Sequence, residues 1–176
     1  MSTHLVCYHT KMSTLTLDEI LANFELSPDY QLIRKKNNSK LRSKTTGYIR
    51  PDGYIHVQYK NQKYYAHRLI YQIIHLMDSL PDKIQIDHVD GNRRNNHSDN
   101  LRLATNLQNQ WNGKIHSNNT SGYKGVTFDK ASKKWKAAIR HGNKLLNLGR
   151  FNSPEDAHLA YKNKAIELFG AFARCE

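Results

Sequence analysis

The stretch from Ile86 to Gly113, IDHVDGNRRNNHSDNLRLATNLQNQWNG, gathers short polar side chains between apolar segments. The segment KIQI predicts a strand that runs into Asp87 and His88, and NLRL predicts a second short strand. The residues between these two strands, VDGNRRNN, are rich in Asn, Asp and Gly, which is typical of a loop. Thr105 and Gln108 match a capping box, so we expect a helix that begins there and stops at the glycine. The predicted unit is therefore strand, loop, strand and helix.

Such a unit could place His88, Asn100 and Asn109 in one cleft. Turns use Asn freely, so we interpret four others as turn or cap residues: Asn92, Asn95, Asn96 and Asn106. Asp90 is expected to close an Asx turn rather than bind metal, and His97 to be a loop residue near phosphate. His67, at a strand end, has a structural and a catalytic interpretation, and both stay open.

The composition predicts a polyanionic partner. The chain has 176 residues, enough for one domain or two small ones, and 27 Lys and Arg against 15 Asp and Glu give a net charge of +12. Between Thr120 and Phe151 there are eight basic residues and one acid. A basic footprint of this density is typical of nucleic-acid binding, although a merely solvated basic surface is the alternative.

Several classes of protein are disfavoured. The longest apolar runs, such as RLIYQIIHLM, are shorter than the roughly 20 residues of a membrane span, so no membrane partner is expected. The N-terminus has no basic head followed by an apolar block, so we do not expect secretion. Cys7 and Cys175 form no C-x-x-C pair, which excludes a zinc ribbon. A disulfide bond between the two cysteines is an alternative that a reducing cytoplasm disfavours.

Three elements are expected before residue 86. Thr16 and Glu19 form a capping box, so residues 16–26 predict a short helix. The segments YIHVQYK and QKYYAHRL predict a hairpin, and Leu69 to Met77 suits a helix. After Gly113, the Ser, Asn and Gly content of KIHSNNTSG predicts a linker.

The last part of the chain predicts three strands and a helix. The strands are YKGVTFD, KWKAAIRH and KLLNLGRF, with turns at DKASK and GN. The helix is delimited by Ser153 as N-cap, Pro154 in the first turn and Gly170 after the last turn. Its expected buried stripe consists of Ala157, Ala160, Tyr161, Ala165, Leu168 and Phe169.

The opening stretch resembles the HNH nuclease motif in its phage homing-endonuclease branch. Asp87-His88 matches the first element, Asn100 the second, and Asn109 the third, where many members have His. The upstream segment AHRLIY also resembles the one that precedes the motif in phage members. The resemblance covers roughly residues 30–113 and its combined spacing is specific.

The resemblance implies one divalent ion, Mg²⁺ or Mn²⁺, held by Asp87 and Asn109 with DNA phosphate oxygens. Carboxylate and amide oxygens are hard ligands that suit such ions, and no zinc is expected. His88 would accept a proton from the attacking water, while Asn100 would bond the loop backbone and orient His88. Three arginines have either a phosphate-contact or a solvated-surface interpretation: Arg68, Arg93 and Arg94.

Residues 121–173 resemble the Apetala-type DNA-binding domain of plant ethylene-response factors and of many phage nucleases. The matching residues are Gly122 to Val126, Trp135, Ala137, Ile139, Arg140, Leu148, Gly149, Phe151, Ala157, Ala160 and Tyr161. The resemblance implies a three-stranded antiparallel sheet backed by a helix, with its open face in the DNA major groove. The plant pattern has more Arg on that face, so the recognised base sequence does not carry over.

Alternation identifies the open face, because Ala137 and Ile139 should face the helix. Arg140 could read guanine and Asn147 adenine, whereas Lys133 and Lys134 suit phosphate. Trp135 has two interpretations, packing on a DNA sugar and a core or edge position in the sheet. The predicted DNA-contacting residues of this part are Lys124, Thr127, Lys133, Lys134, Trp135, Lys136, Arg140, Lys144, Asn147 and Arg150.

Together these features predict an α+β protein: a ββα-metal (HNH) nuclease module with an N-terminal hairpin, followed by a three-stranded antiparallel sheet plus helix. The expected divisions are an N-terminal helical segment (1–28), the nuclease domain (29–115), a linker (116–120) and the Apetala-type domain (121–176). We expect a metal-dependent endonuclease of the phage homing type, which nicks or cleaves double-stranded DNA in the bacterial host cytoplasm. A monomer is expected, a dimer stays open, and no protein partner is implied. The alternatives are a DNA-binding regulator with a degenerate HNH fold and an RNA-directed binder, which the major-groove mode disfavours.

Overall fold

The structure, a computed structural model, describes residues 15–35, 47–115 and 118–175. Contacts divide the chain into two compact units, Met1–Leu103 and Ala104–Glu176, which are described one at a time. None of the helices in the described ranges combines the length and apolarity that a membrane crossing needs.

The first unit begins with helix α1 (Leu17–Asn23), whose N-terminus carries the predicted capping box between Thr16 and Glu19. The helix is shorter than we predicted. It ends at Asn23 because the next residues are extended and form strand β1 (Phe24–Leu26), which pairs antiparallel with β2 (Leu32–Arg34). Phe24 is fully buried, so a cross-strand partner and a core position replace the last helical turn.

The predicted hairpin is confirmed as β4 (Ile55–Tyr59) and β5 (Gln62–Tyr65), and β3 (Tyr48–Ile49) pairs with the outer edge of β4. The turn residues Lys60 and Asn61 both have positive φ, the backbone of a type I′ turn.

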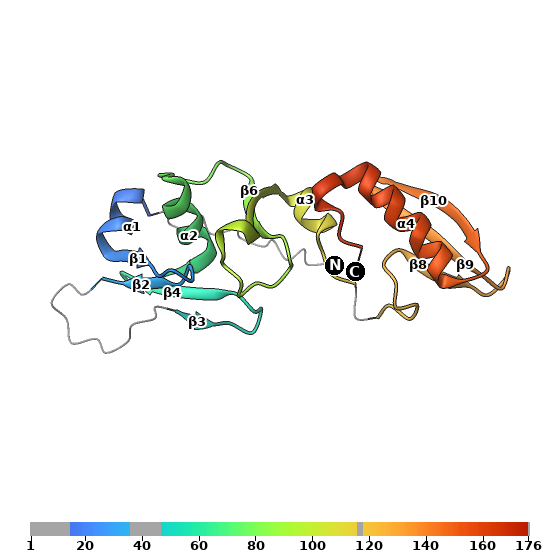
Figure 1. The fold of residues 1–176 in the computed structure, drawn as a ribbon, viewed down its shortest axis with the longest axis horizontal. Helices are drawn as coiled ribbons and strands as arrows, with labels where there is room; N and C mark the ends of the chain where they lie inside the picture. The colour runs from blue at the N-terminus through green and yellow to red at the C-terminus, as the bar shows by residue number, and fades with distance from the viewer. Residues whose placement is uncertain (1–14, 36–46, 116–117, 176) are drawn as a thin grey trace, which may run out of the picture. The chain divides into compact units, whose positions relative to one another are not determined.

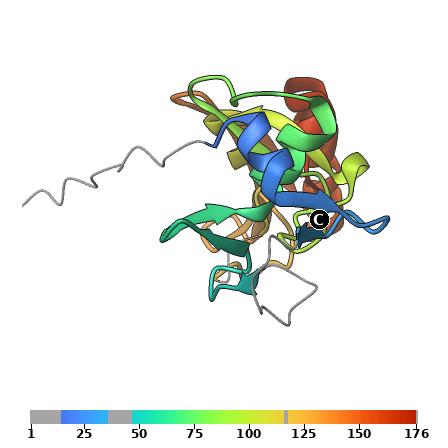
Figure 2. The ribbon, with the colours of Figure 1, turned by 90° about the vertical axis from the view of Figure 1, so that its left-hand side faces the viewer.

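Helix α2 (Ala66–His75) follows β5 without a break, three residues earlier than the expected start at Leu69. It packs beside α1, and Figures 1 and 2 show these two helices side by side, with strands β1, β2 and β4 beneath them. The first core lies between these elements; its members under 3% exposed include Ile20, Phe24, Val57, Leu69 and Ile70.

The quoted stretch forms the predicted strand, loop, strand and helix. Strand β6 (Ile84–His88) pairs with β7 (Leu101–Thr105), and the loop between them ends in a 3-10 turn, η1 (Ser98–Asn100). Helix α3 (Asn106–Trp111) has both hydrogen bonds of the Thr105–Gln108 capping box.

The second unit continues with β8 (Val126–Asp129), β9 (Lys134–His141) and β10 (Lys144–Phe151) in the order β10-β9-β8, all antiparallel. Helix α4 (Pro154–Phe169) contacts all three strands, and a 3-10 turn, η2 (Gly170–Phe172), follows it. Figure 1 shows α4 lying along this sheet. Ala157, Tyr161, Ala165 and Phe169 are its buried residues, and Ala160 and Leu168 are half-buried. The small alanines allow close packing on the sheet.

Candidate active site and nucleic-acid interface

The carboxyl end of β6 carries the two predicted residues Asp87 and His88, and both are buried. The imidazole of His88 is held by Asn96, whose Oδ1 lies 3.0 Å from Nε2. An amide oxygen can only accept, so Nε2 is the protonated nitrogen and Nδ1 the basic one. This tautomer suits a general base that works through Nδ1.

A second imidazole and a tyrosine ring lie beside His88. The ring of His67, on the first turn of α2, lies 5.1 Å from that of His88 in an edge-to-face arrangement, and the ring of Tyr54 lies 5.9 Å away. Burial lowers the pKa of His88, although the bond to Asn96 opposes this. The imidazole therefore stays neutral, and able to accept a proton, at a lower pH than a solvated histidine.

The side chain of Asn100 forms hydrogen bonds that stabilise the loop between β6 and β7. Its Oδ1 accepts a hydrogen bond from the Asp90 backbone at 2.9 Å, and its Nδ2 donates to the Asn95 carbonyl at 2.7 Å and to Asp90 Oδ1 at 2.9 Å. Asp90 also accepts from the Asn92 backbone at 2.7 Å, which is the predicted Asx turn. Asn100 thus bonds the loop backbone, whereas the imidazole of His88 is hydrogen-bonded by Asn96.

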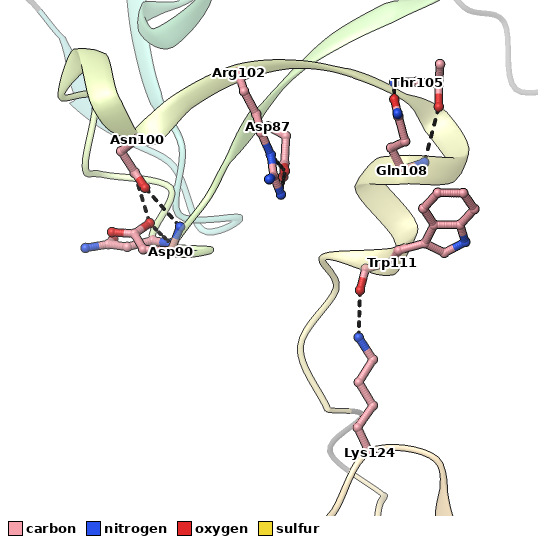
Figure 3. A network of polar contacts seen from close by, with 9 residues as sticks. Asp87, Asp90, Asn100, Arg102, Thr105, Gln108, Trp111 and Lys124 are labelled. Carbon is pink, nitrogen blue, oxygen red and sulfur yellow. Dashed lines mark hydrogen bonds and ion pairs between the residues drawn. The ribbon is translucent and has the colours of Figure 1, made fainter. Parts of the chain in front are cut away.

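Asp87 is paired with an arginine that we did not predict as a site residue. Arg102, on β7, places Nε at 2.9 Å and Nη2 at 2.8 Å from Asp87 Oδ2. The carboxylate side chain is 4% exposed and the arginine side chain 19%. Figure 3 shows the two side chains facing each other. A charged residue inside the apolar NLRL strand was the available signal, whereas nothing distinguished Asn96 from the other loop asparagines.

The described residues fit a metal ion that takes most of its ligands from substrate and water. Mg²⁺ is commonly bound by one or two carboxylates together with phosphate oxygens, and Asp87 offers a hard oxygen donor beside the histidine. Across the described ranges, no three His, Cys, Asp or Glu side chains gather as a metal cage. Asn109, the other predicted ligand, lies half-buried on α3 in the second unit.

The three arginines predicted to contact phosphate differ in their surroundings: Arg93 and Arg94 lie in the loop and Arg68 lies on α2. Arg93 donates from Nη1 to the Asp52 carbonyl at 2.6 Å, and its guanidinium lies 4.7 Å from the Tyr54 ring centre. Arg94 is exposed and Arg68 half-buried. His97 N-caps η1 through a contact to the Asp99 backbone and packs on Tyr30 at 4.5 Å between ring centres. Arg93 and Arg94 are therefore more exposed than Arg68.

In the second unit, the predicted alternation of β9 is confirmed: Ala137 and Ile139 are buried, at 0% and 2% exposure. The opposite face therefore carries Lys136, Ala138 and Arg140. The register aligns Thr127 with Lys136 and Asn147 with Ala138. The predicted contact residues that are exposed are Thr127, Lys133, Lys134, Arg140, Lys144, Asn147 and Arg150.

Lys124, one of the predicted DNA contacts, donates hydrogen bonds to backbone carbonyls of the second unit. Nζ donates to the carbonyls of Trp111 at 2.8 Å, Gly113 at 2.7 Å and Arg174 at 3.1 Å. Figure 3 shows the bond to Trp111. All three donors of the ammonium are thus occupied by backbone. We define Lys124 and these three carbonyls as the lysine clasp.

Two further predicted contacts have partners within the sheet. Arg150 Nε donates to Asp129 Oδ2 at 2.8 Å, which holds the pKa of that carboxyl at about 2. Trp135 is half-buried, packs with Val126 and Ala137, and meets Phe128 edge-to-face. Trp135 therefore has the core and edge position that we gave as its second interpretation.

Comparison with known proteins places relatives among phages and large viruses. A family model described as HNH endonuclease matches residues 64–111. Protein 3.8 of Escherichia phage T7 is 38% identical over 95 residues, 54% of this chain and 78% of the relative. An HNH endonuclease of Acanthamoeba polyphaga mimivirus is 35% identical over 131 residues, 74% of this chain and 66% of the relative.

Among solved structures, a chain from a study of DNA binding and cleavage by the HNH homing endonuclease I-HmuI is similar to part of the protein. It is 29% identical, with a TM-score of 0.38, and the match covers 50% of this chain and 51% of that chain.

Proposed function

This chain belongs to a family of phage and viral proteins with an HNH endonuclease domain, and we propose that it hydrolyses a phosphodiester bond of double-stranded DNA. The observation that carries the proposal is the buried pair Asp87–His88, with the His88 imidazole held in one tautomer by Asn96. One such site per chain supports a nick in one strand, made by a monomer.

The proposed roles follow from the chemistry of each side chain. Nδ1 of His88 takes a proton from the attacking water, and the loop held by Asn100 keeps the histidine in place. We propose Asp87 and Asn109 as the protein ligands of one Mg²⁺ or Mn²⁺. When bound, the ion stabilises negative charge on the phosphate and on the leaving oxygen.

We further propose that residues 121–176 form an Apetala-type DNA-binding domain, joined by residues 116–120 to the nuclease domain of residues 29–115. Support comes from the three-stranded antiparallel sheet backed by α4, whose opposite face carries Lys136, Arg140 and Asn147. The major groove is wide enough for such a sheet. Tethering two weak binders raises their effective concentration on one DNA. The proposed setting is a phage-infected bacterial cell, where a homing role would fit.

The test is incubation of the purified protein with supercoiled plasmid, with and without Mg²⁺ or Mn²⁺, beside the His88→Ala protein. We expect metal-dependent conversion to open circles that the variant loses, because His88 supplies the base. A linear product would indicate paired active sites. Plasmid that is retarded but uncut under every metal would replace this proposal by the DNA-binding regulator.

A further inference from the structure

The carboxylate proposed to bind the metal ion is already paired with a cation. From the neighbouring strand β7, Arg102 donates a hydrogen bond from Nε to Oδ2 of Asp87, and its Nη2 lies 2.8 Å from the same oxygen as an ion pair. The carboxylate side chain is 4% exposed, so solvent screens this ion pair weakly. A buried carboxylate without a compensating charge is strongly unfavourable, and Arg102 supplies that charge in the DNA-free protein.

A divalent ion that approaches Asp87 therefore meets the field of the guanidinium. If Arg102 stays in place, two positive groups share one carboxylate and repel each other at short range. If Arg102 moves away, the charge-assisted hydrogen bond from Nε and the close ion pair through Nη2 are both lost. Both routes weaken the binding of the ion, and the phosphate oxygens of DNA provide the negative charge that offsets this repulsion.

We propose that Arg102 is a positioning residue that holds the Asp87 carboxylate and makes tight binding of the divalent ion conditional on bound DNA. The inference rests on the proposed function, since it concerns the metal site of that nuclease. It assigns a role toward the ion to a residue outside the three motif positions. The consequence is a protein that carries little metal until a substrate phosphate is present.

The test measures Mn²⁺ binding without DNA, from the free-ion signal in electron paramagnetic resonance. Arg102→Gln should bind Mn²⁺ at least ~10-fold more tightly than wild type, because a short-range repulsion is removed. Arg102→Lys, which keeps the charge, should stay near wild type. Asp87→Asn combined with Arg102→Gln should lose the gain. Arg50→Gln, which breaks an exposed ion pair with Asp52, is the matched control and should change nothing.

A second measurement needs no variant and so does not depend on Arg102→Gln folding. Wild type should bind Mn²⁺ at least ~10-fold more tightly with a non-cleavable duplex than without DNA. Equal affinity with and without the duplex overturns the proposal, and so does an Arg102→Gln protein that is folded by circular dichroism yet binds Mn²⁺ no more tightly. These titrations are independent of cleavage: an uncut plasmid with the predicted titrations removes the nuclease proposal alone.

Discussion

One amide decides which nitrogen of His88 is basic. Because Asn96 Oδ1 accepts from Nε2, its loss would free the ring to rotate and to change tautomer. We expect Asn96→Ala to lower the single-turnover cleavage rate about 10- to 100-fold, the usual effect of removing such a supporting partner. Asn96→Asp keeps an acceptor and should retain most of the rate. Affinity for DNA, measured by fluorescence anisotropy, should be equal in all three proteins; an Asn96→Ala protein as fast as wild type contradicts the role.

His67 makes the stability of the first unit depend on pH. Burial holds its pKa well below the ordinary value, and the neighbouring His88, Arg68 and His56 act in the same direction. The unfolded chain therefore binds more protons than the folded one below about pH 6.5, so the free energy of unfolding falls as the pH is lowered through this range. Urea unfolding at pH 7.5 and pH 5.5 measures the loss.

The His67→Phe protein provides the matched comparison. Nδ1 of His67 is buried, with no hydrogen-bond partner among the described residues, so an apolar ring is tolerated there. The variant should lose less stability than wild type between the two pH values. If the variant and wild type lose the same free energy of unfolding between the two pH values, the pH dependence comes from other groups. His56 is one such group, because burial also lowers its pKa.

Helix α3 depends on tertiary contacts within the second unit, because six residues are too few for an isolated helix. Its Trp111 ring stacks on Phe169 with 4.3 Å between ring centres, and the lysine clasp holds its C-terminal carbonyl. The ring stacking and the lysine clasp explain why α3 belongs to the same compact unit as the residues that follow it.

The lysine clasp and the open sheet face predict opposite effects for two cations of the second unit. Lys124→Met should lower the free energy of unfolding by at least about 2 kcal/mol, since losing a single hydrogen bond from a charged donor costs roughly 1.5–3 kcal/mol and this variant loses the bonds to all three carbonyls. Arg140→Ala should leave stability within about 0.5 kcal/mol but weaken DNA binding by about 1–3 kcal/mol. Urea unfolding and fluorescence anisotropy separate the two. Weaker DNA binding by a stable Lys124→Met protein would restore Lys124 as a contact.

The chain as a whole carries a net charge of +12, so its affinity for DNA should depend steeply on salt. The slope of log K against log salt is about −0.9 for each phosphate contact. Replacing Lys136 and Arg140 together by Ala should make the slope shallower by up to about two units, if both touch phosphate or bases near it. Anisotropy titrations at several NaCl concentrations measure this. Lys162→Ala, exposed on α4, is the control; an equal effect there would indicate a diffuse basic surface.

Local patterns determined much of the architecture. The capping boxes at Thr16 and Thr105, the N-cap Ser153 and the alternation of β9 all predicted elements that the structure contains, because each depends on hydrogen bonds or burial within a few residues. The end of α1 was not predictable in this way. Phe24 leaves the helix for a strand whose partner lies eight to ten residues away, and that pairing outweighs local helical preference.

The sequence by itself determined that the chain has an Asp-His pair at a strand end, an Asn-rich loop and a basic sheet module, because motif spacing and periodicity are local properties. Only the tertiary structure decided that Asn96 holds His88, that Arg102 pairs with Asp87, and that Lys124 is enclosed by carbonyls. Each of these contacts joins residues that are 8 to 50 positions apart in the chain. Chain folding and burial select the partners, since a buried charge or imidazole must find one, and residue type alone does not say which.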